Sequence, residues 1–403
     1  MQNRRTFIKQ SVLAGSAASF IPVSALGNGW KENVTPADVK SDTYTVNMRS
    51  ALKLSSIPPR QITIPDTGGF KVLKGDFHIH TLFSDGRVMP GDRIDEAVQN
   101  GFDVISITDH IEYRPFFSKV GRWKLNDEQG NDFNLWYKLA KPDADRQNLL
   151  LISGAEVTKS TMAPGHFNVL FPDDVNPIAA AVDDWREMLK IAAAQGCFII
   201  WNHPGWEAPN SGGIEKGAPL RFTDEHEDVC KQGLIHGIEI FNEMEHYPVV
   251  SDWCNEKNLA IFANSDIHAS ELNLYGIQNP LRPITLVLAK ERTVESVKEA
   301  MFARRTIGWA ANMLWGRDPW LPELFKASVE IKTITPGVVE LTNKSSLPIS
   351  VSLGGGVYNL PNNTQQQVFR AEGVKTLTVV NWMIGMNKPL EISLSEIHEN
   401  KAD

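Results

Sequence analysis

From residue 70 onward, short apolar runs alternate with stretches of amphipathic helical pattern, and this rhythm restricts the fold more than any other feature of the chain. The runs are rich in Ile, Val, Leu and Phe, as is typical of strands buried on both faces. Helical patterns separate several runs, and the alternation predicts an α/β fold, either a parallel barrel or a doubly wound sheet. The expected strands are 75–80, 104–109, 149–156, 166–171, 197–202, 237–242, 259–265 and 284–288, and the expected helices are 92–99, 183–195, 249–257 and 293–302.

Two stretches interrupt this rhythm, 111–148 and 205–228, and each follows an expected strand. We predict that both are loops beside an active site, since the loops after barrel strands build such sites. After residue 325 the pattern changes to short, partly alternating runs separated by turn residues. This change predicts a small all-β domain, a sandwich at 326–403, behind a barrel domain at 66–325.

The first 25 residues have the pattern of a targeting segment. Arg4 and Arg5 precede a short apolar stretch at 12–21, and small residues follow up to Ala25. The segment resembles a twin-arginine export signal, with an ordinary secretory or lipoprotein-like signal as the alternative. We therefore expect an exported protein, most simply a periplasmic one, with a linker or arm at 26–65. No other segment is apolar enough to predict a membrane span.

Charge and cysteine content exclude some classes of protein. The formal net charge is -8, so a broad nucleic-acid-binding surface is not expected. The three cysteines, Cys197, Cys230 and Cys254, are widely spaced and predict buried thiols rather than a disulfide framework. The sequence leaves the oligomeric state open.

Histidine and carboxylate side chains gather at the ends of the expected strands. His78 and His80 lie two residues apart on one strand and so share a face, and Asp85 follows in a turn. In a parallel barrel the carboxyl ends of the strands converge on one rim, where active sites lie. The other members of this set, each at or next to a strand end, are His110, Glu156, His166, His203, Asp266 and His268.

Each of these residues has a structural interpretation when taken alone. Asp85 before Gly86 suits a turn, Glu156 suits a paired buried acid, and His166 suits a partner for a backbone group. Nine such residues on one predicted rim instead indicate a metal site. Imidazole and carboxylate together suit zinc, manganese or iron.

Other polar and aromatic residues have two open interpretations. Asp109 precedes His110 and faces the other way on a strand, so we expect either a partner of the ligands or a structural role. Arg114 and Lys159 are candidates for a phosphate clamp or for solvated charges. Glu239 and Asn242 are candidates to face the cavity. Structural or surface roles are expected for four histidines, His226, His236, His246 and His398. For four tryptophans we expect core packing, and the alternative is an aromatic wall that contacts the substrate; these are Trp123, Trp136, Trp201 and Trp206.

The ordered motifs resemble those of the PHP family, the polymerase and histidinol phosphatase superfamily. The resemblance spans about residues 70–310 and includes every motif in order; the tail after it is similar to a two-domain, phosphodiesterase-like subgroup. It rests on His78-Ile79-His80, Ser84-Asp85-Gly86, Thr108-Asp109-His110, Glu156, Gly165-His166, Asn202-His203-Pro204 and Ser265-Asp266-Ile267-His268.

The resemblance implies a distorted seven-stranded (β/α) barrel that holds two to three divalent metal ions. It implies that the first ion takes His78, His80, Glu156 and Asp266, the second Glu156, His166 and His203, and the third Asp85, His110 and His268. Asp109, Glu156 and His203 are the candidate catalytic residues. The expected function is hydrolysis of a small phosphorylated substrate, because divalent ions activate water and neutralise phosphate charge. Preference for mono- or diesters, the resident metals and the natural substrate stay open.

Two rival functions come from other classes. An amidohydrolase would share the first histidine pair but would recruit a lysine ligand, which the motifs do not supply. A non-catalytic binding protein would use the β domain for a glycan or partner and the barrel as a scaffold. The complete set of ligand positions favours the phosphoesterase.

Overall fold

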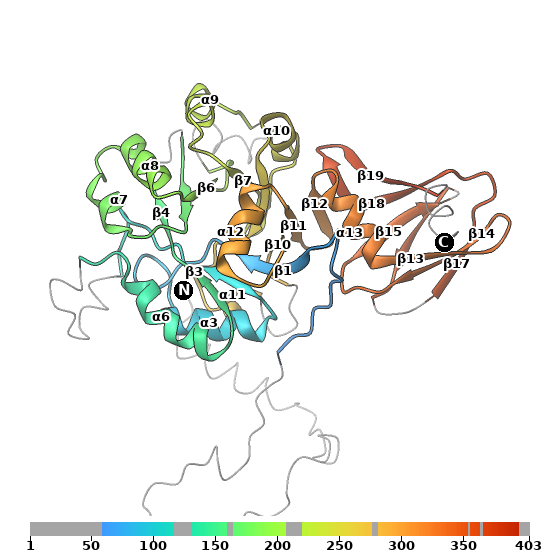
Figure 1. Ribbon diagram of the computed structural model, residues 1–403, viewed down its shortest axis with the longest axis horizontal. Coiled ribbons are helices and arrows are strands. Elements are labelled where there is room, and N and C mark those ends of the chain that lie inside the picture. The colour runs from blue at the N-terminus through green and yellow to red at the C-terminus, as the bar shows by residue number, and fades with distance from the viewer. Residues whose placement is uncertain are drawn as a thin grey trace, which may run out of the picture. The chain divides into compact units, whose positions relative to one another are not determined.

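A computed structural model describes residues 59–116, 131–158, 164–206, 220–275, 281–353, 355–362 and 366–394, and all of them belong to one compact unit, Pro59–Asp403 (Figure 1). The export signal, His398, Lys159 and Trp123 lie outside the described residues. The chain is a mixed α/β protein, as predicted.

The first sheet has ten strands. Its parallel part joins β1 (Lys71–Asp76), β2 (Val104–Ser106) and β3 (Leu150–Ile152). On the other side of β1 the strands run antiparallel, through β10 (Ile284–Ala289) and β11 (Thr306–Ala310) to β12 (Met313–Gly316). The expected strand at 284–288 is therefore present, but it runs against its neighbours.

The second sheet carries the middle of the chain. It contains β4 (Gly154–Val157), β5 (Phe167–Leu170), β6 (Phe198–Trp201), β7 (Gly237–Asn242), β8 (Glu245–His246) and β9 (Ala260–Asn264). β6, β7 and β9 are parallel neighbours, whereas β5 is antiparallel to both β4 and β6. The expectation of parallel strands throughout is wrong at β5, because the link from Val157 to Phe167 is too short for the crossover of about a dozen residues that parallel strands need.

Two isolated parallel bridges connect the sheets. Ile79, beyond β1, pairs with Ile267, beyond β9, and His110, beyond β2, pairs with Glu156 in β4. Both bridges lie where the strands end, at the positions of the candidate ligands. The ends of the two sheets are thereby held together.

Helices cover the sheets, with α6 against β3, α8 against β6, α10 against β7 and α12 against β10. Asp184 caps α8 by accepting hydrogen bonds from the amides of Arg186 and Glu187. Part of the expected loop 111–148 is the helix α6. The sequence did not predict this helix because Pro142, a residue that usually interrupts helices, lies inside it. The helices are α3 (Pro90–Gln99), α6 (Leu135–Arg146), α7 (Asn176–Ala180), α8 (Trp185–Ala194), α9 (Asp224–Lys231), α10 (Val250–Lys257), α11 (Glu271–Tyr275), α12 (Val294–Phe302) and α13 (Trp320–Ser328).

The C-terminal strands contribute to two sheets. A three-stranded sheet holds β13, β14 and β17, while β18 continues the ten-stranded sheet by pairing with β12 at Leu314 and Trp315. The indole of Trp382 on β18 meets Phe325 of α13 edge-on. The domain boundary predicted after residue 325 would lie inside α13. The division into a barrel domain and a separate β domain stays a prediction. The strands are β13 (Val329–Thr335), β14 (Val338–Asn343), β15 (Ile349–Leu353), β16 (Gly356–Leu360), β17 (Gln366–Arg370), β18 (Thr376–Gly385) and β19 (Lys388–Ser393).

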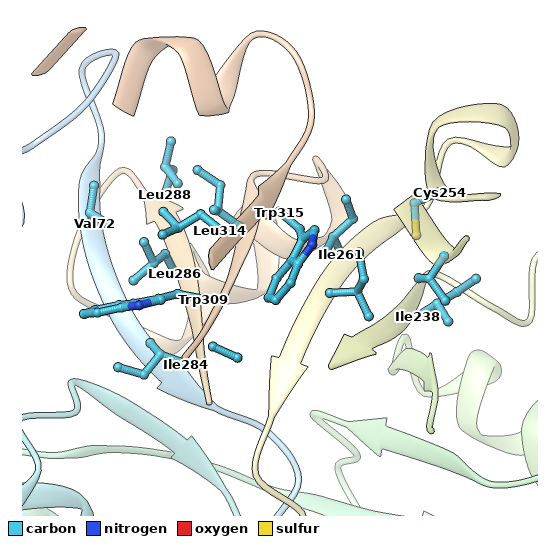
Figure 2. Close-up of a cluster of buried hydrophobic side chains, with 14 of the residues drawn as sticks. Val72, Ile238, Cys254, Ile261, Ile284, Leu286, Leu288, Trp309, Leu314 and Trp315 are labelled. Carbon is cyan, nitrogen blue, oxygen red and sulfur yellow. The ribbon is translucent and has the colours of Figure 1, made fainter. Parts of the chain in front are cut away.

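A buried apolar cluster joins the two sheets (Figure 2). Leu286 of β10 and Trp309 of β11 lie on one side, and Ile238 of β7 and Ile261 of β9 on the other. Burial of such side chains is worth about 1.5–3 kcal/mol each, so this cluster stabilises the frame behind the candidate site. The three cysteines are free thiols; Cys197 and Cys254 are buried, as predicted, whereas Cys230 is only half-buried. In the described part of the chain, none of the helices combines the length and apolar character needed to cross a bilayer.

Candidate metal centre

The nine predicted ligands lie where strands of the two sheets end. His78 and His80 follow β1, His203 follows β6, and Asp266 and His268 follow β9. These strands are linked through parallel pairings, so their carboxyl ends face the same side. His78 and His80 are fully buried, and only His268 is more than a third exposed at its side chain.

Glu156 lies at the centre of this nine-residue cluster, and each of its carboxylate oxygens faces a different set of imidazoles. Oε2 lies 3.1 Å from Nε2 of both His78 and His80 and 3.4 Å from Nδ1 of His110. Oε1 lies 3.0 Å from Nδ1 of His166 and 3.5 Å from Nε2 of His203. A carboxylate placed in this way can serve two neighbouring positive charges.

Two aspartates complete the cluster. Oδ1 of Asp266 lies 3.1 Å from Nε2 of His78 and 3.0 Å from Nε2 of His80. Oδ1 of Asp85 lies 3.3 Å from Nε2 of His268, and its Oδ2 lies 3.6 Å from Nε2 of His110. The carboxylates therefore alternate with imidazoles across the site.

The ligand atoms form overlapping groups in which all atoms lie within 4.8 Å of one another. The structure thus brings together all nine residues predicted from the sequence, and the binding of a metal by each stays a prediction. The groups are His78, His80 and Asp266; His78, Glu156 and His203; His110, Glu156 and His166; and His80, Asp85, His110 and His268.

Several buried polar atoms of the cluster indicate that it suits a cation. Nε2 of His80, Nδ1 of His110 and Oδ1 of Asp266 have no hydrogen-bond partner within the described residues, although His80 and Asp266 approach to 3.0 Å. Leaving such atoms unpaired costs about 1–3 kcal/mol each. A divalent ion among these nitrogen and oxygen donors would remove that cost.

Charges in the cluster shift its pKa values strongly. Burial lowers the pKa of His80, but the carboxylates of Asp266 and Glu156 outweigh it and raise the value to about 10. Burial raises the pKa of Glu156, but His110 and His78 hold it well below its usual range. Burial lowers the pKa of His110 to about 4. In the absence of ions the cluster therefore keeps protons that metal binding must displace.

A cavity of about 430 Å³ opens onto the cluster. Seven of its described lining residues are cluster members, and the three others, Tyr113, Trp206 and Glu243, come from outside the cluster. The cluster members in the lining are Asp85, His110, Glu156, His166, His203, Asp266 and His268.

Comparison with known proteins gives a strong match among solved structures. No family model matches the chain, and no curated protein matches it. Among solved structures, a two-domain protein from Bacteroides vulgatus that contains a predicted PHP-like metal-dependent phosphoesterase is 31% identical, with a TM-score of 0.74, over 84% of this chain and 99% of that one. The chain belongs to the PHP-like metal-dependent phosphoesterases.

Two further solved structures are more distant from this PHP-like protein. A metal-dependent phosphoesterase from Bifidobacterium adolescentis is 15% identical, with a TM-score of 0.38, over 57% of this chain and 96% of that one. An amidohydrolase from Chromobacterium violaceum is 15% identical, with a TM-score of 0.34, over 50% of this chain and 89% of that one.

Behind the cluster of this PHP-like protein lies a layer of buried polar residues. Glu239 accepts a hydrogen bond of 2.9 Å from Nδ1 of His78, and the amides of Asn242 and Asn264 donate to its two oxygens at 2.8 and 2.9 Å. Asn202 donates to Oε1 of Glu156 at 2.9 Å. The sequence marked Glu239 and Asn242 only as candidates for the cavity. A carboxylate inside the apolar run of β7 was the signal for Glu239.

Asp109 is buried and holds the turn that carries Asp85. Its carboxylate accepts hydrogen bonds from the amide of Thr81 at 2.7 Å and from the hydroxyl of Ser84 at 2.5 Å. It is absent from the described lining of the cavity. The geometry gives Asp109 a positioning role, which is the alternative to catalysis that the sequence left open.

The remaining candidates have structural contacts. Nε of Arg114 donates to the carbonyl of Phe83, and its guanidinium lies over the ring of Phe133. His226 stacks on Trp201 with ring centroids 3.7 Å apart and hydrogen-bonds the carbonyl of Pro164. His236 lies against Phe198 and Phe302, His246 lies against Trp315, and Trp136 and Trp201 are core residues.

Proposed function

We propose that this protein hydrolyses esters of phosphoric acid with about two to three divalent ions, zinc, manganese or iron, held by the nine-residue cluster. One observation carries the proposal: the two oxygens of Glu156 face separate groups of imidazoles, as a carboxylate shared by two ions requires. Family membership supports the phosphoesterase class. Bound divalent ions supply Lewis acidity, which turns water into a nucleophile near neutral pH and neutralises phosphoryl charge.

The residues of the chain prepare this chemistry by fixing charge and orientation. Glu156 and Asp266 stay ionised because the neighbouring histidines hold their pKa values well below the usual range. His110 stays unprotonated near neutral pH because burial lowers its pKa to about 4. The amide of His203 donates to Glu239 at 2.9 Å, which fixes the backbone at this candidate catalytic residue.

The assignment of ions follows the resemblance. We propose His78, His80, Glu156 and Asp266 for the first, Glu156, His166 and His203 for the second, and Asp85, His110 and His268 for the third. The close groups His78–His80–Asp266 and His80–Asp85–His110–His268 support the first and third sets. The second set is supported by the approach of both His166 and His203 to Oε1 of Glu156. We also propose that the strands form a distorted barrel of seven strands, supported by the bridges at Ile79–Ile267 and His110–Glu156. Export to the periplasm and a small phosphorylated substrate remain part of the proposal on sequence grounds.

Activity assays with defined metal content test the proposal. Elemental analysis of protein purified without chelator should find about two to three transition-metal ions per chain. The protein should hydrolyse 4-nitrophenyl phosphate or bis(4-nitrophenyl) phosphate, lose the activity on chelation and regain it with manganese or zinc. Which of the two esters is preferred decides between monoester and diester chemistry.

The same preparation tests the rival amidohydrolase. No lysine is among the described residues that line the cavity, so this part of the lining does not favour that rival. Metal-dependent cleavage of 4-nitroacetanilide or of a simple lactone, without cleavage of either phosphate ester, would replace the proposal. Less than one ion per chain, with no activity after adding metal, would overturn the metal site itself.

A further inference from the structure

The cavity is larger than a phosphate group requires. Its volume of about 430 Å³ lies within the range of about 300–1,000 Å³ that is typical of pockets for whole small molecules. Beyond the nine-residue cluster, its described lining consists of Tyr113, Trp206 and Glu243. Among the described residues, these three side chains are the groups available to contact the alcohol part of an ester whose phosphate sits at the cluster.

Two of the three present aromatic rings beside the imidazoles. The ring of Trp206 lies 5.7 Å from that of His203, and the ring of Tyr113 lies 6.0 Å from that of His110. Both side chains are large and partly exposed, 52% for Trp206 and 44% for Tyr113. Aromatic faces of this kind pack well against the flat or apolar face of a ring.

The third residue is an acid that is not part of the metal groups. Glu243 lies in the turn between β7 and β8 with a φ of 50°, which is unfavourable for a residue with a Cβ. Its amide donates to the carbonyl of Asn264 at 3.3 Å, so the turn is tied to β9. Within the described residues its carboxylate forms no ion pair, and burial together with the charge of Asp266 raises its pKa. Glu243 thus offers two acceptor oxygens to a ligand.

We propose that Tyr113, Trp206 and Glu243 form a subsite that selects esters of a hydroxylated ring, such as a sugar ring, without a second anionic group. The inference rests on the proposed phosphoesterase function. The aromatic rings contact the faces of the ring, and the carboxylate accepts hydrogen bonds from its hydroxyl groups. A second phosphate is repelled by the carboxylate of Glu243.

Three esters separate these effects: glucose 6-phosphate, cyclohexyl phosphate, which has the ring without hydroxyls, and glucose 1,6-bisphosphate. Wild type should prefer the first over both others in kcat/KM. In Glu243→Gln the ratio of glucose 6-phosphate to cyclohexyl phosphate should fall about fivefold, because a charge-assisted hydrogen bond is about twice as strong as a neutral one. The ratio of bisphosphate to monophosphate should rise in the same variant, since the repulsion is removed.

Glu245→Gln is the matched control. Glu245 lies on the same hairpin but hydrogen-bonds the hydroxyl of Tyr247 and is absent from the described lining of the cavity. Both ratios should stay at the wild-type value in this control. The inference is overturned if Glu243→Gln moves neither ratio, or if Glu245→Gln moves both equally.

Calorimetric titration separates failure of the subsite from failure of the proposed function. If the manganese- or zinc-loaded wild type hydrolyses none of the three esters and neither of the two 4-nitrophenyl esters, the proposed function fails. Binding of glucose 6-phosphate more tightly than cyclohexyl phosphate, with the difference reduced in Glu243→Gln, would still support the subsite. Equal affinity for the two compounds, or no binding of either, would overturn it.

Discussion

Nδ1 of His78 lies 2.9 Å from Oε1 of Glu239, and this hydrogen bond leaves Nε2 of the same ring facing Glu156 and Asp266, each at 3.1 Å. The bond places the proton on Nδ1 and keeps the lone pair of Nε2 available for a cation. Glu239 is itself held by the amides of Asn242 and Asn264. A carboxylate that faces no cavity thus sets the state of a candidate ligand.

Glu239→Gln should weaken metal binding about 10- to 100-fold, the usual effect of losing such a partner. Glutamine can donate to Nδ1, which would move the ring proton to Nε2 and remove the lone pair. Competition with a chromophoric chelator measures the affinity, with Glu245→Gln as the carboxyl-to-amide control. Unchanged affinity in Glu239→Gln would show that this bond does not set the state of His78.

Glu156→Gln and His268→Ala should differ in the number of ions lost. Glu156 contacts five imidazoles, so its loss of charge should release more than one ion. His268 belongs to one close group and its side chain is 38% exposed, so its removal should release one ion. Both should lower turnover strongly. Elemental analysis and initial rates on the two variants measure this ranking, and full metal content in Glu156→Gln would contradict it.

The pH dependence of thermal stability should differ between metal-loaded and chelated protein. In chelated protein the raised pKa of His80 gives stability that is complete below 6.5 and is lost as pH rises toward about 10. The lowered pKa of Glu156 gives stability above 4.5 that is lost as pH falls below it. The chelated protein should therefore be most stable between pH 4.5 and pH 6.5, because His80 and Glu156 then both carry charge.

Metal binding needs unprotonated imidazoles and so gains strength as pH rises. The difference in Tm between metal-loaded and chelated protein should grow from pH 5.5 to pH 8.5. Thermal melts across this range with manganese or zinc measure the difference. A constant difference would show that the ions do not displace the protons of the cluster.

Arg93 of α3 should be needed to hold two ligand strands together. The buried guanidinium donates to the carbonyls of His80, Ile267 and Ala269 at 3.0, 2.9 and 2.9 Å. Arg93→Lys cannot reproduce this fork, and each lost bond from a charged donor costs about 1.5–3 kcal/mol.

The variant should lower the free energy of unfolding by several kcal/mol and reduce occupancy near His268. Urea unfolding and elemental analysis measure the two effects. Arg186→Lys, an exposed arginine of α8, serves as the control. Equal stability of the two variants would contradict a positioning role for Arg93.

Local pattern in the sequence was sufficient to select the nine candidate residues that the structure brings together. His78 and His80 share a face because strand side chains alternate with a period of two, and this property needs no knowledge of the rest of the fold. The position of Glu156 and Asp266 at strand ends is equally visible in the apolar runs. For that reason all nine predicted ligands come together in the structure.

The sequence by itself thus determined the α/β class, the residue types of the site and their order, because periodicity and strand ends are local properties. Only the tertiary structure decided that β5 runs antiparallel, that Asp109 points at the Thr81–Ser84 turn, and that Glu239 supports His78. It also decided that Glu243 lines the cavity. Strand direction and contacts between residues far apart in the chain depend on how the two sheets pack, and no local pattern specifies that.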